Sequence, residues 1–234
     1  MIMPHSTADA TTPPPSNDSP DATHAASVDR WREMHRDGYF QDHRKYQDRF
    51  QMRGVDRLLE LLEPDRDDDL LEIGCGYGRL IYRLAPLVNR VTGVDVAPEP
   101  IEDARSFLAG FRNVDLKQTN GVDLSVLPDA SFDGVWSVTV FQHLPRAAVE
   151  RYFDETRRVL RPGGRLCFQF MTGGDTEEDI RNEAKEQSVS WSAAQIASLA
   201  ERRRFIVRRL EFESVKHHPQ FDWYWILADH EGCR

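Results

Sequence analysis

The chain has 234 residues, 40% of them hydrophobic, and its 30 basic and 39 acidic side chains give a formal net charge of −9. This length allows one domain with a substantial core plus an extension, and the acidic balance argues against a nucleic-acid phosphate backbone as partner. No apolar run reaches the length of a membrane span, and three widely spaced cysteines form neither a metal-ligand pair nor a disulfide framework.

The first segment, residues 1–27, is rich in Pro, Ser, Thr, Ala and Asp, which is typical of a disordered tail. It lacks the basic start and apolar core of a signal peptide, so we expect a cytoplasmic protein. The composition then changes, and we assign 28–64 to an N-terminal helical lid or cap. One helical face of this segment carries aromatic and imidazole side chains, namely Tyr39, His43, Tyr46 and Phe50. They either pack against the domain or close over a ligand.

The next feature is a strand followed by a glycine-rich turn. The apolar run Leu70–Ile73 predicts a buried parallel strand. Three glycines then stand at alternate positions, and apolar residues at helical spacing follow from Arg79 to Leu87. The glycines Gly74, Gly76 and Gly78 therefore occupy the turn before a helix, where glycine lets the backbone approach a ligand closely.

A second strand, Arg90–Asp95, ends in an acid 21 positions after Gly74. A carboxylate at this place can accept two hydrogen bonds from a ribose diol. Further strands and helices alternate to the end of the chain: a helix from 97 to about 108, a strand over 113–118, a strand over 132–140, a helix over 145–160, a sharp turn at 161–164, a strand over 165–170, a helix over 192–203, and strands over 205–212 and 221–228. This order predicts a doubly wound α/β domain closed by a hairpin-like pair.

The pattern Glu72-x-Gly74-x-Gly76-x-Gly78 resembles motif I of the class I S-adenosylmethionine (SAM)-dependent methyltransferases. Phe132–Ser137 resembles motif IV, and Val159–Leu166 resembles the turn before strand five of this family. The resemblance covers about residues 58–228. It implies a Rossmann-like seven-stranded sheet with an antiparallel last strand and helices on both faces, with 65–234 as the SAM-binding methyltransferase domain.

The resemblance also implies a set of cofactor-binding positions: Glu72, Gly74, Cys75, Gly76, Gly78, Asp95, Val96, Asn120, Gly121, Ser137 and Gln142. Asp95 is expected on the ribose, and Glu72 near the amino group of the cofactor, with a strand-end salt bridge as the alternative for Glu72. Asn120 stands where the family usually has an acid on the adenine amino group. Its amide oxygen can accept the same hydrogen bond, and Asp123 is the alternative.

His143 follows the fourth predicted strand, where open α/β sheets bind their ligands. It can act as a general base. The resemblance implies Tyr39 or Tyr46 as its partner, because some members of the family, the phosphoethanolamine methyltransferases, pair a histidine at this position with an N-terminal tyrosine. The alternative is that His143 only shapes the pocket. Many methyl acceptors need only orientation.

These features predict a SAM-dependent enzyme that methylates oxygen, nitrogen or sulfur of a small molecule. We expect no metal, no nucleic-acid or membrane partner, and a monomer or homodimer. Two alternatives are a methyltransferase-like domain that binds a ligand or partner without catalysis, and a nicotinamide-dependent oxidoreductase. The glycine spacing and the strand count argue against the oxidoreductase.

Overall fold

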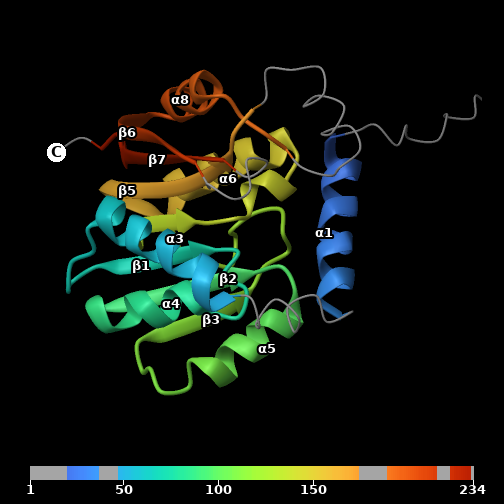
Figure 1. Ribbon diagram of the computed structural model, residues 1–234, viewed down its shortest axis with the longest axis vertical. Coiled ribbons are helices and arrows are strands. Elements are labelled where there is room, and N and C mark those ends of the chain that lie inside the picture. Colours follow the sequence, from blue (N-terminus) through green and yellow to red (C-terminus); the bar gives the residue numbers. More distant parts are fainter. Residues whose placement is uncertain (1–19, 37–46, 174–188, 215–221, 233–234) are drawn as a thin grey trace, which may run out of the picture.

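The computed structural model describes residues 20–36, 47–173, 189–214 and 222–232. In this part of the chain the strands form one sheet of seven, in the order β3-β2-β1-β4-β5-β7-β6 (Figure 1). They are β1 (Asp69–Ile73), β2 (Arg90–Asp95), β3 (Val114–Gln118), β4 (Phe132–Ser137), β5 (Leu160–Met171), β6 (Phe205–Glu213) and β7 (Trp223–His230). β1 to β5 run parallel, and β7 runs antiparallel to both of its neighbours. The sheet predicted from the sequence is confirmed.

Helices cover both faces of this sheet. They are α3 (Gln47–Leu62), α4 (Arg79–Leu84), α5 (Pro98–Phe107), α6 (Arg146–Val159) and α8 (Ala193–Arg202). A further helix, α1 (Pro20–Arg36), and the 3₁₀ turns η1 (Ala85–Leu87) and η2 (Phe141–His143) complete the described helical elements. One buried apolar cluster joins α6 and α8 to the sheet, and a second joins α3, α4 and α5 to it. Adjacent residues of β1, Leu70 and Leu71, enter different clusters. The parallel strands therefore read as continuous apolar runs, because both faces are covered.

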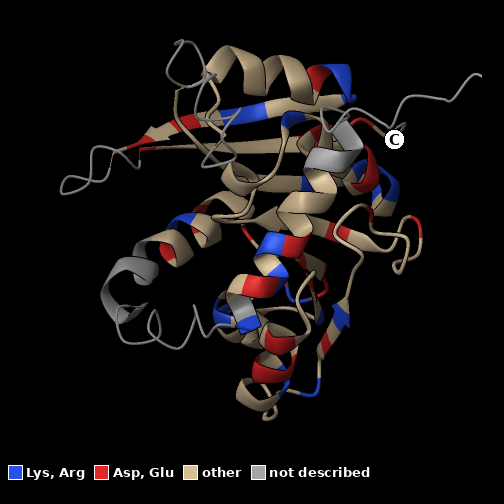
Figure 2. Ribbon diagram, turned by 90° about the vertical axis from the view of Figure 1, so that its right-hand side faces the viewer, with Lys and Arg blue, Asp and Glu red and all other residues tan. Residues whose placement is uncertain are grey.

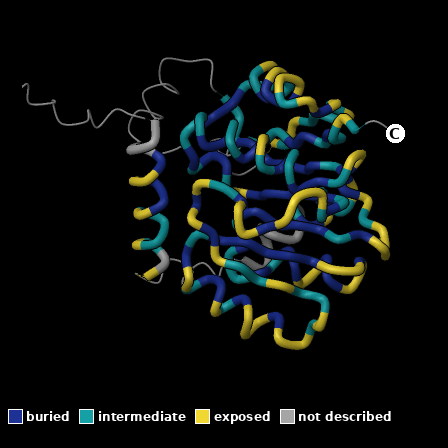
Figure 3. The backbone as a smooth tube through the Cα atoms, turned by 180° about the vertical axis from the view of Figure 1, so that it is seen from behind, coloured by how far each residue is buried: buried dark blue, intermediate teal, exposed yellow. Residues whose placement is uncertain are grey.

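The helix α1 lies across the edge of the sheet where the parallel strands end (Figure 1). Its buried positions, among the residues whose burial is described, are His24, Ser27 and Val28, and intermediate positions follow toward its end (Figure 3). The expectation of a disordered tail over 1–27 is therefore wrong for residues 20–27, which are helical. Tertiary contacts with α6 and η2 order this segment, although its composition alone disfavours order.

The strand β4 ends at Ser137, three residues before the end predicted from the sequence. Two residues later Thr139 has a φ of +59°, which a strand does not tolerate. The left-handed turn redirects the chain into η2.

Two other boundaries differ from the sequence prediction. The first helix after the glycines ends at Leu84, and η1 with Pro86 replaces its last turn. The predicted sharp turn at 161–164 lies inside β5, which begins at Leu160 and has an irregular register against β4. Gly163, with a φ of +80°, accommodates this irregularity.

Charged residues of both signs are interspersed on the face shown in Figure 2. A search of the described residues finds no helix long and apolar enough to cross a membrane.

Candidate active site

The three glycines form a turn between β1 and α4 in which each has positive φ: +73° at Gly74, +51° at Gly76 and +86° at Gly78. The backbone N–H groups of Gly74 and Cys75 both donate to the carbonyl of Val94, at 2.8 and 3.0 Å. A Cβ at Gly74 would collide with Val140, whereas a Cβ at Gly76 would meet nothing within 4 Å in the described structure. Val140 therefore fills the space beside Gly74, whereas the space beside Gly76 is open.

Asp95 ends β2 and faces this turn. Its side chain is buried, and its two carboxylate oxygens accept hydrogen bonds from the N–H groups of Gly76 at 2.9 Å and Ala97 at 3.0 Å. These bonds fix the carboxylate beside the open surface of Gly76. Each oxygen retains a lone pair for a further donor.

Glu72 lies one strand away on β1 and is 2% exposed. Its Oε2 atom has no hydrogen-bond partner among the described residues. Burial raises the pKa of Glu72 to about 8, against the opposing effects of the Arg79 charge and the nearby Trp136 indole N–H. A buried carboxyl with an unused oxygen is an acceptor for a donor that the chain itself does not supply.

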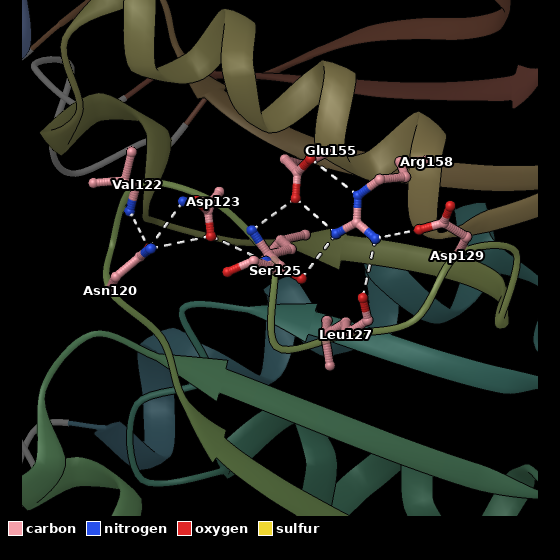
Figure 4. A network of polar contacts seen from close by, with 9 residues as sticks. Asn120, Val122, Asp123, Ser125, Leu127, Asp129, Glu155 and Arg158 are labelled. Atoms are coloured by element: carbon pink, nitrogen blue, oxygen red, sulfur yellow. Dashed lines mark hydrogen bonds and ion pairs between the residues drawn. The ribbon is translucent and has the colours of Figure 1, made fainter.

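The loop after β3 carries Asn120, whose side chain is turned to its own backbone (Figure 4). Its Oδ1 atom accepts from the N–H groups of Val122 at 2.7 Å and Asp123 at 3.0 Å, and its Nδ2 atom donates to Asp123. The carboxylate of Asp123 also accepts from the N–H of Ser125, and hydrogen bonds with Ser125 lower its pKa. Asn120 therefore shapes the loop, and its amide oxygen is already engaged.

Arg158 of α6 anchors the same loop (Figure 4). Its guanidinium donates to the carboxylates of Glu155 and Asp129 and to the carbonyls of Leu124 and Leu127. Glu155 in turn accepts from the N–H of Leu124 at 2.8 Å, and its hydrogen bonds to Arg158 lower its pKa. The loop therefore has a fixed position relative to the sheet.

Gly121 of this loop lies directly under α1. It has a φ of +80°, and an added Cβ would come within 2.7 Å of Val28 and 2.8 Å of Val96. Arg32 of α1 also donates to the carbonyl of Val96 at 3.4 Å. The helix thus covers the ends of β2 and β3.

His143, in η2, contacts the same helix. Its ring lies 4.5 Å from the ring of Trp31, edge to face, and its carbonyl accepts from the Ser27 hydroxyl at 2.9 Å. Gln142 places its Nε2 atom 3.1 Å from His143 Nε2. Burial, together with the charge of Arg30, lowers the pKa of His143 to about 4. The imidazole is therefore neutral at pH 7.

Residues 71–168 match the family model described as a methyltransferase domain. The 27-O-demethylrifamycin SV methyltransferase of Amycolatopsis mediterranei is 36% identical over 142 residues, which cover 58% of this chain and 51% of that protein. The nocamycin O-methyltransferase of Saccharothrix syringae is 37% identical over 119 residues, covering 47% of this chain and 40% of that one. Over residues 71–168 the chain is therefore similar to the methyltransferase-domain family.

A solved SAM-dependent methyltransferase from Methanosarcina mazei has the same fold, with a TM-score of 0.61 and 21% identity, covering 70% of this chain and 93% of that one. The chain spans about half the length, or less, of the two curated relatives named above. The described chain therefore has the fold of a SAM-dependent methyltransferase.

The methyltransferase structure places the remaining predicted residues as follows. Ser137 is buried, and its hydroxyl donates to the carbonyl of Ile73 at 2.9 Å, so it ties the ends of β1 and β4 together. Cys75 is buried below the glycine turn, and burial raises the pKa of its thiol. Tyr39 and Tyr46 lie outside the described residues. Within the described part of the chain, no group of three His, Cys, Asp or Glu side chains could hold a metal ion.

Sequence reasoning missed the contribution of α1 to the site. His24, Val28 and Trp31 stand at i, i+4 and i+7, and this helical spacing was a usable signal inside the low-complexity segment. It also missed Thr139, because a positive φ at threonine has no sequence signature.

Proposed function

We propose that this protein binds SAM and transfers its methyl group to an oxygen atom of a small molecule, with nitrogen and sulfur as further acceptor types. The observation that carries the proposal is Asp95, held by the backbone of Gly76 and Ala97 beside an open glycine surface. The match of residues 71–168 to the methyltransferase-domain family supports SAM over a dinucleotide. The names of the two curated relatives, both O-methyltransferases of small molecules, support oxygen as the acceptor atom.

The residues fit such a cofactor. Asp95 offers carboxylate lone pairs to a ribose diol, and the unused oxygen of Glu72 offers an acceptor to an amino group. Gly76 leaves room for the ligand against the backbone. Bound there, SAM supplies an electrophilic methyl group on a sulfonium. The assignments of Asn120, Gly121, Ser137 and Gln142 to the cofactor stay predictions.

The contribution of the chain is orientation and the exclusion of water. α1 covers the ends of β2, β3 and β4 through Arg32, Val28 and Ser27. This arrangement supports a lid function for the N-terminal part. A neutral His143 can hold an acceptor hydroxyl by a hydrogen bond or take its proton. The lowered pKa makes it a weak base, so we favour the hydrogen-bonding role.

Calorimetric titration tests the cofactor. SAM and its demethylated product S-adenosylhomocysteine (SAH) should bind, and NAD should not. Binding of NAD in place of SAM would move the assignment to the oxidoreductase. A screen of hydroxylated aromatic and polyketide-like compounds for SAH formation then tests the reaction, with amines and thiols as further sets. A protein that binds SAM but yields no SAH with any set would support the non-catalytic alternative.

A further inference from the structure

Thr139 occupies a conformation that threonine rarely adopts. Its φ is +59°, in the left-handed region, where a β-branched side chain is a strong outlier. The same residue is exposed, although the neighbouring Val138 is buried. Strain of this kind persists only where the surrounding structure over-determines the backbone.

The structure provides that support in Gln169. This residue lies on β5 and is 5% exposed. Its Oε1 atom accepts a hydrogen bond from the backbone N–H of Thr139 at 3.1 Å. The Thr139 hydroxyl donates to the carbonyl of Val138 at 2.7 Å. A buried side chain of one strand thus fixes the turn that follows the neighbouring strand.

The turn decides where the next residues lie. Val140 packs on Gly74, so closely that a Cβ on that glycine would collide with it. The carbonyl of Val140 then accepts from the N–H of His143 at 2.9 Å. The strained turn therefore connects the first glycine of the cofactor turn to the histidine under α1.

We propose that Thr139 and Gln169 form a positioning pair that holds Val140 against Gly74 and so keeps the cofactor turn in its binding conformation. The inference rests on the proposed SAM binding. Without the Gln169 oxygen, Thr139 relaxes toward negative φ and Val140 leaves Gly74. The binding-competent state is then a minor state, and the apparent dissociation constant rises in inverse proportion to its population.

A glycine substitution at Thr139 distinguishes the proposed support of the turn by Gln169 from ordinary packing of Gln169. Because glycine adopts positive φ without strain, Thr139→Gly removes the need for support. Gln169→Leu should weaken SAM and SAH binding about tenfold, which corresponds to the strain of one such residue. The double variant Thr139→Gly/Gln169→Leu should bind within about threefold of wild type. Titration calorimetry measures both ligands, and thermal melting follows the protein without ligand.

Arg204→Gly is the matched control, because Arg204 also has a positive φ, +60°, between α8 and β6. It removes comparable strain elsewhere, so the double variant Arg204→Gly/Gln169→Leu should bind SAM and SAH as weakly as Gln169→Leu alone. Thr139→Ala keeps the positive φ and removes the hydroxyl and methyl groups. Because Gln169 supports the backbone N–H of residue 139, this variant should bind SAM with wild-type affinity. If Gln169→Leu does not fold, Gln169→Asn takes its place in the experiment. Its side chain is one carbon shorter, which withdraws the amide oxygen from the N–H of Thr139.

Wild-type affinity in Gln169→Leu, or equal rescue by Thr139→Gly and Arg204→Gly, would overturn the proposal. A wild type that binds neither SAM nor SAH would overturn the proposed function instead. In that case hydrogen exchange at the Gly74 N–H, which donates to the carbonyl of Val94, still tests the pair. Thr139→Gly should restore the protection of this N–H that is lost in Gln169→Leu, and Arg204→Gly should not.

Discussion

Two carboxyl groups and one imidazole lie at the candidate site, and their surroundings differ. Asp95 is tied to two backbone N–H groups, Glu72 is buried with an unused oxygen, and His143 is held neutral. Each is fixed by the strand or turn on which it lies. Substitution of one of them should therefore change one property at a time.

Asp95→Asn should weaken SAM binding by about 1.5–3 kcal/mol, the range for a hydrogen bond to a charged group. The amide keeps the shape of the side chain but loses one acceptor oxygen and the charge. Titration calorimetry measures the loss, and the melting temperature of the unliganded variant shows whether the bonds to Gly76 and Ala97 survive. An unchanged affinity would remove Asp95 from the ribose site.

His143 should titrate far below the ordinary range of histidine. Its half-buried ring packs against Trp31, and desolvation together with the charge of Arg30 lowers its pKa, so an NMR titration should give a midpoint near a pKa of about 4. Because the pKa is lowered, protonation costs stability only as the pH falls below about 6.5 toward this value. Methyl transfer should then be insensitive to this group between pH 6 and 9.

Trp31→Ala opens the ring of His143 to water and should raise that midpoint. A wild-type midpoint near 6.5 would contradict the burial of the ring under α1. His143→Gln serves as the control that identifies its resonance.

At the scale of the element, α1 is the part of the fold that turns an open sheet edge into a covered site. Three of its side chains contact three different loops: Val28 packs on Gly121, Arg32 donates to Val96, and Ser27 donates to His143. Each of these contacts depends on one side chain of α1, so a single substitution can weaken the docking of the helix.

Val28→Asp should loosen α1, because it removes an apolar contact worth about 1.5–3 kcal/mol and places a charge against Gly121. We expect faster proteolytic cleavage of the N-terminal segment and weaker SAH binding. Ala26→Asp, at an exposed position of the same helix, is the control. Equal cleavage of both variants would show that helix propensity, and not docking, controls the segment.

At the scale of the whole molecule, the sheet imposes a pH dependence on stability through Glu72. Its pKa of about 8 in the folded chain lies above the ordinary value of 4.5. Between these values the folded state holds a proton that the unfolded chain has lost. The free energy of unfolding should therefore fall as the pH rises through this window and level off above it.

Glu72→Gln should remove this dependence and melt higher than wild type at pH 8, with a difference that disappears near pH 4.5. The upper limit of the gain is about 5 kcal/mol, since one pKa unit corresponds to about 1.4 kcal/mol. Thermal melting from pH 4.5 to 9 measures it. A constant difference between the variants across this range would contradict the proton uptake at Glu72.

The sequence by itself determined the sheet, the glycine turn and the place of Asp95. These depend on short-range patterns: apolar runs that both faces of a parallel sheet require, and glycines where the backbone must take positive φ at Gly74 and Gly76. The spacing from Gly74 to Asp95 then follows from one strand–helix–strand unit.

Only the tertiary structure decided the order of α1 and the environment of His143. Residues 20–27 form a helix because they meet α6 and η2, contacts more than 100 positions away in the chain. The strained turn at Thr139 depends on Gln169, thirty positions along the chain. Such features arise from side chains brought together by the sheet. The helical spacing of His24, Val28 and Trp31 indicates a helix, but it does not indicate where that helix packs.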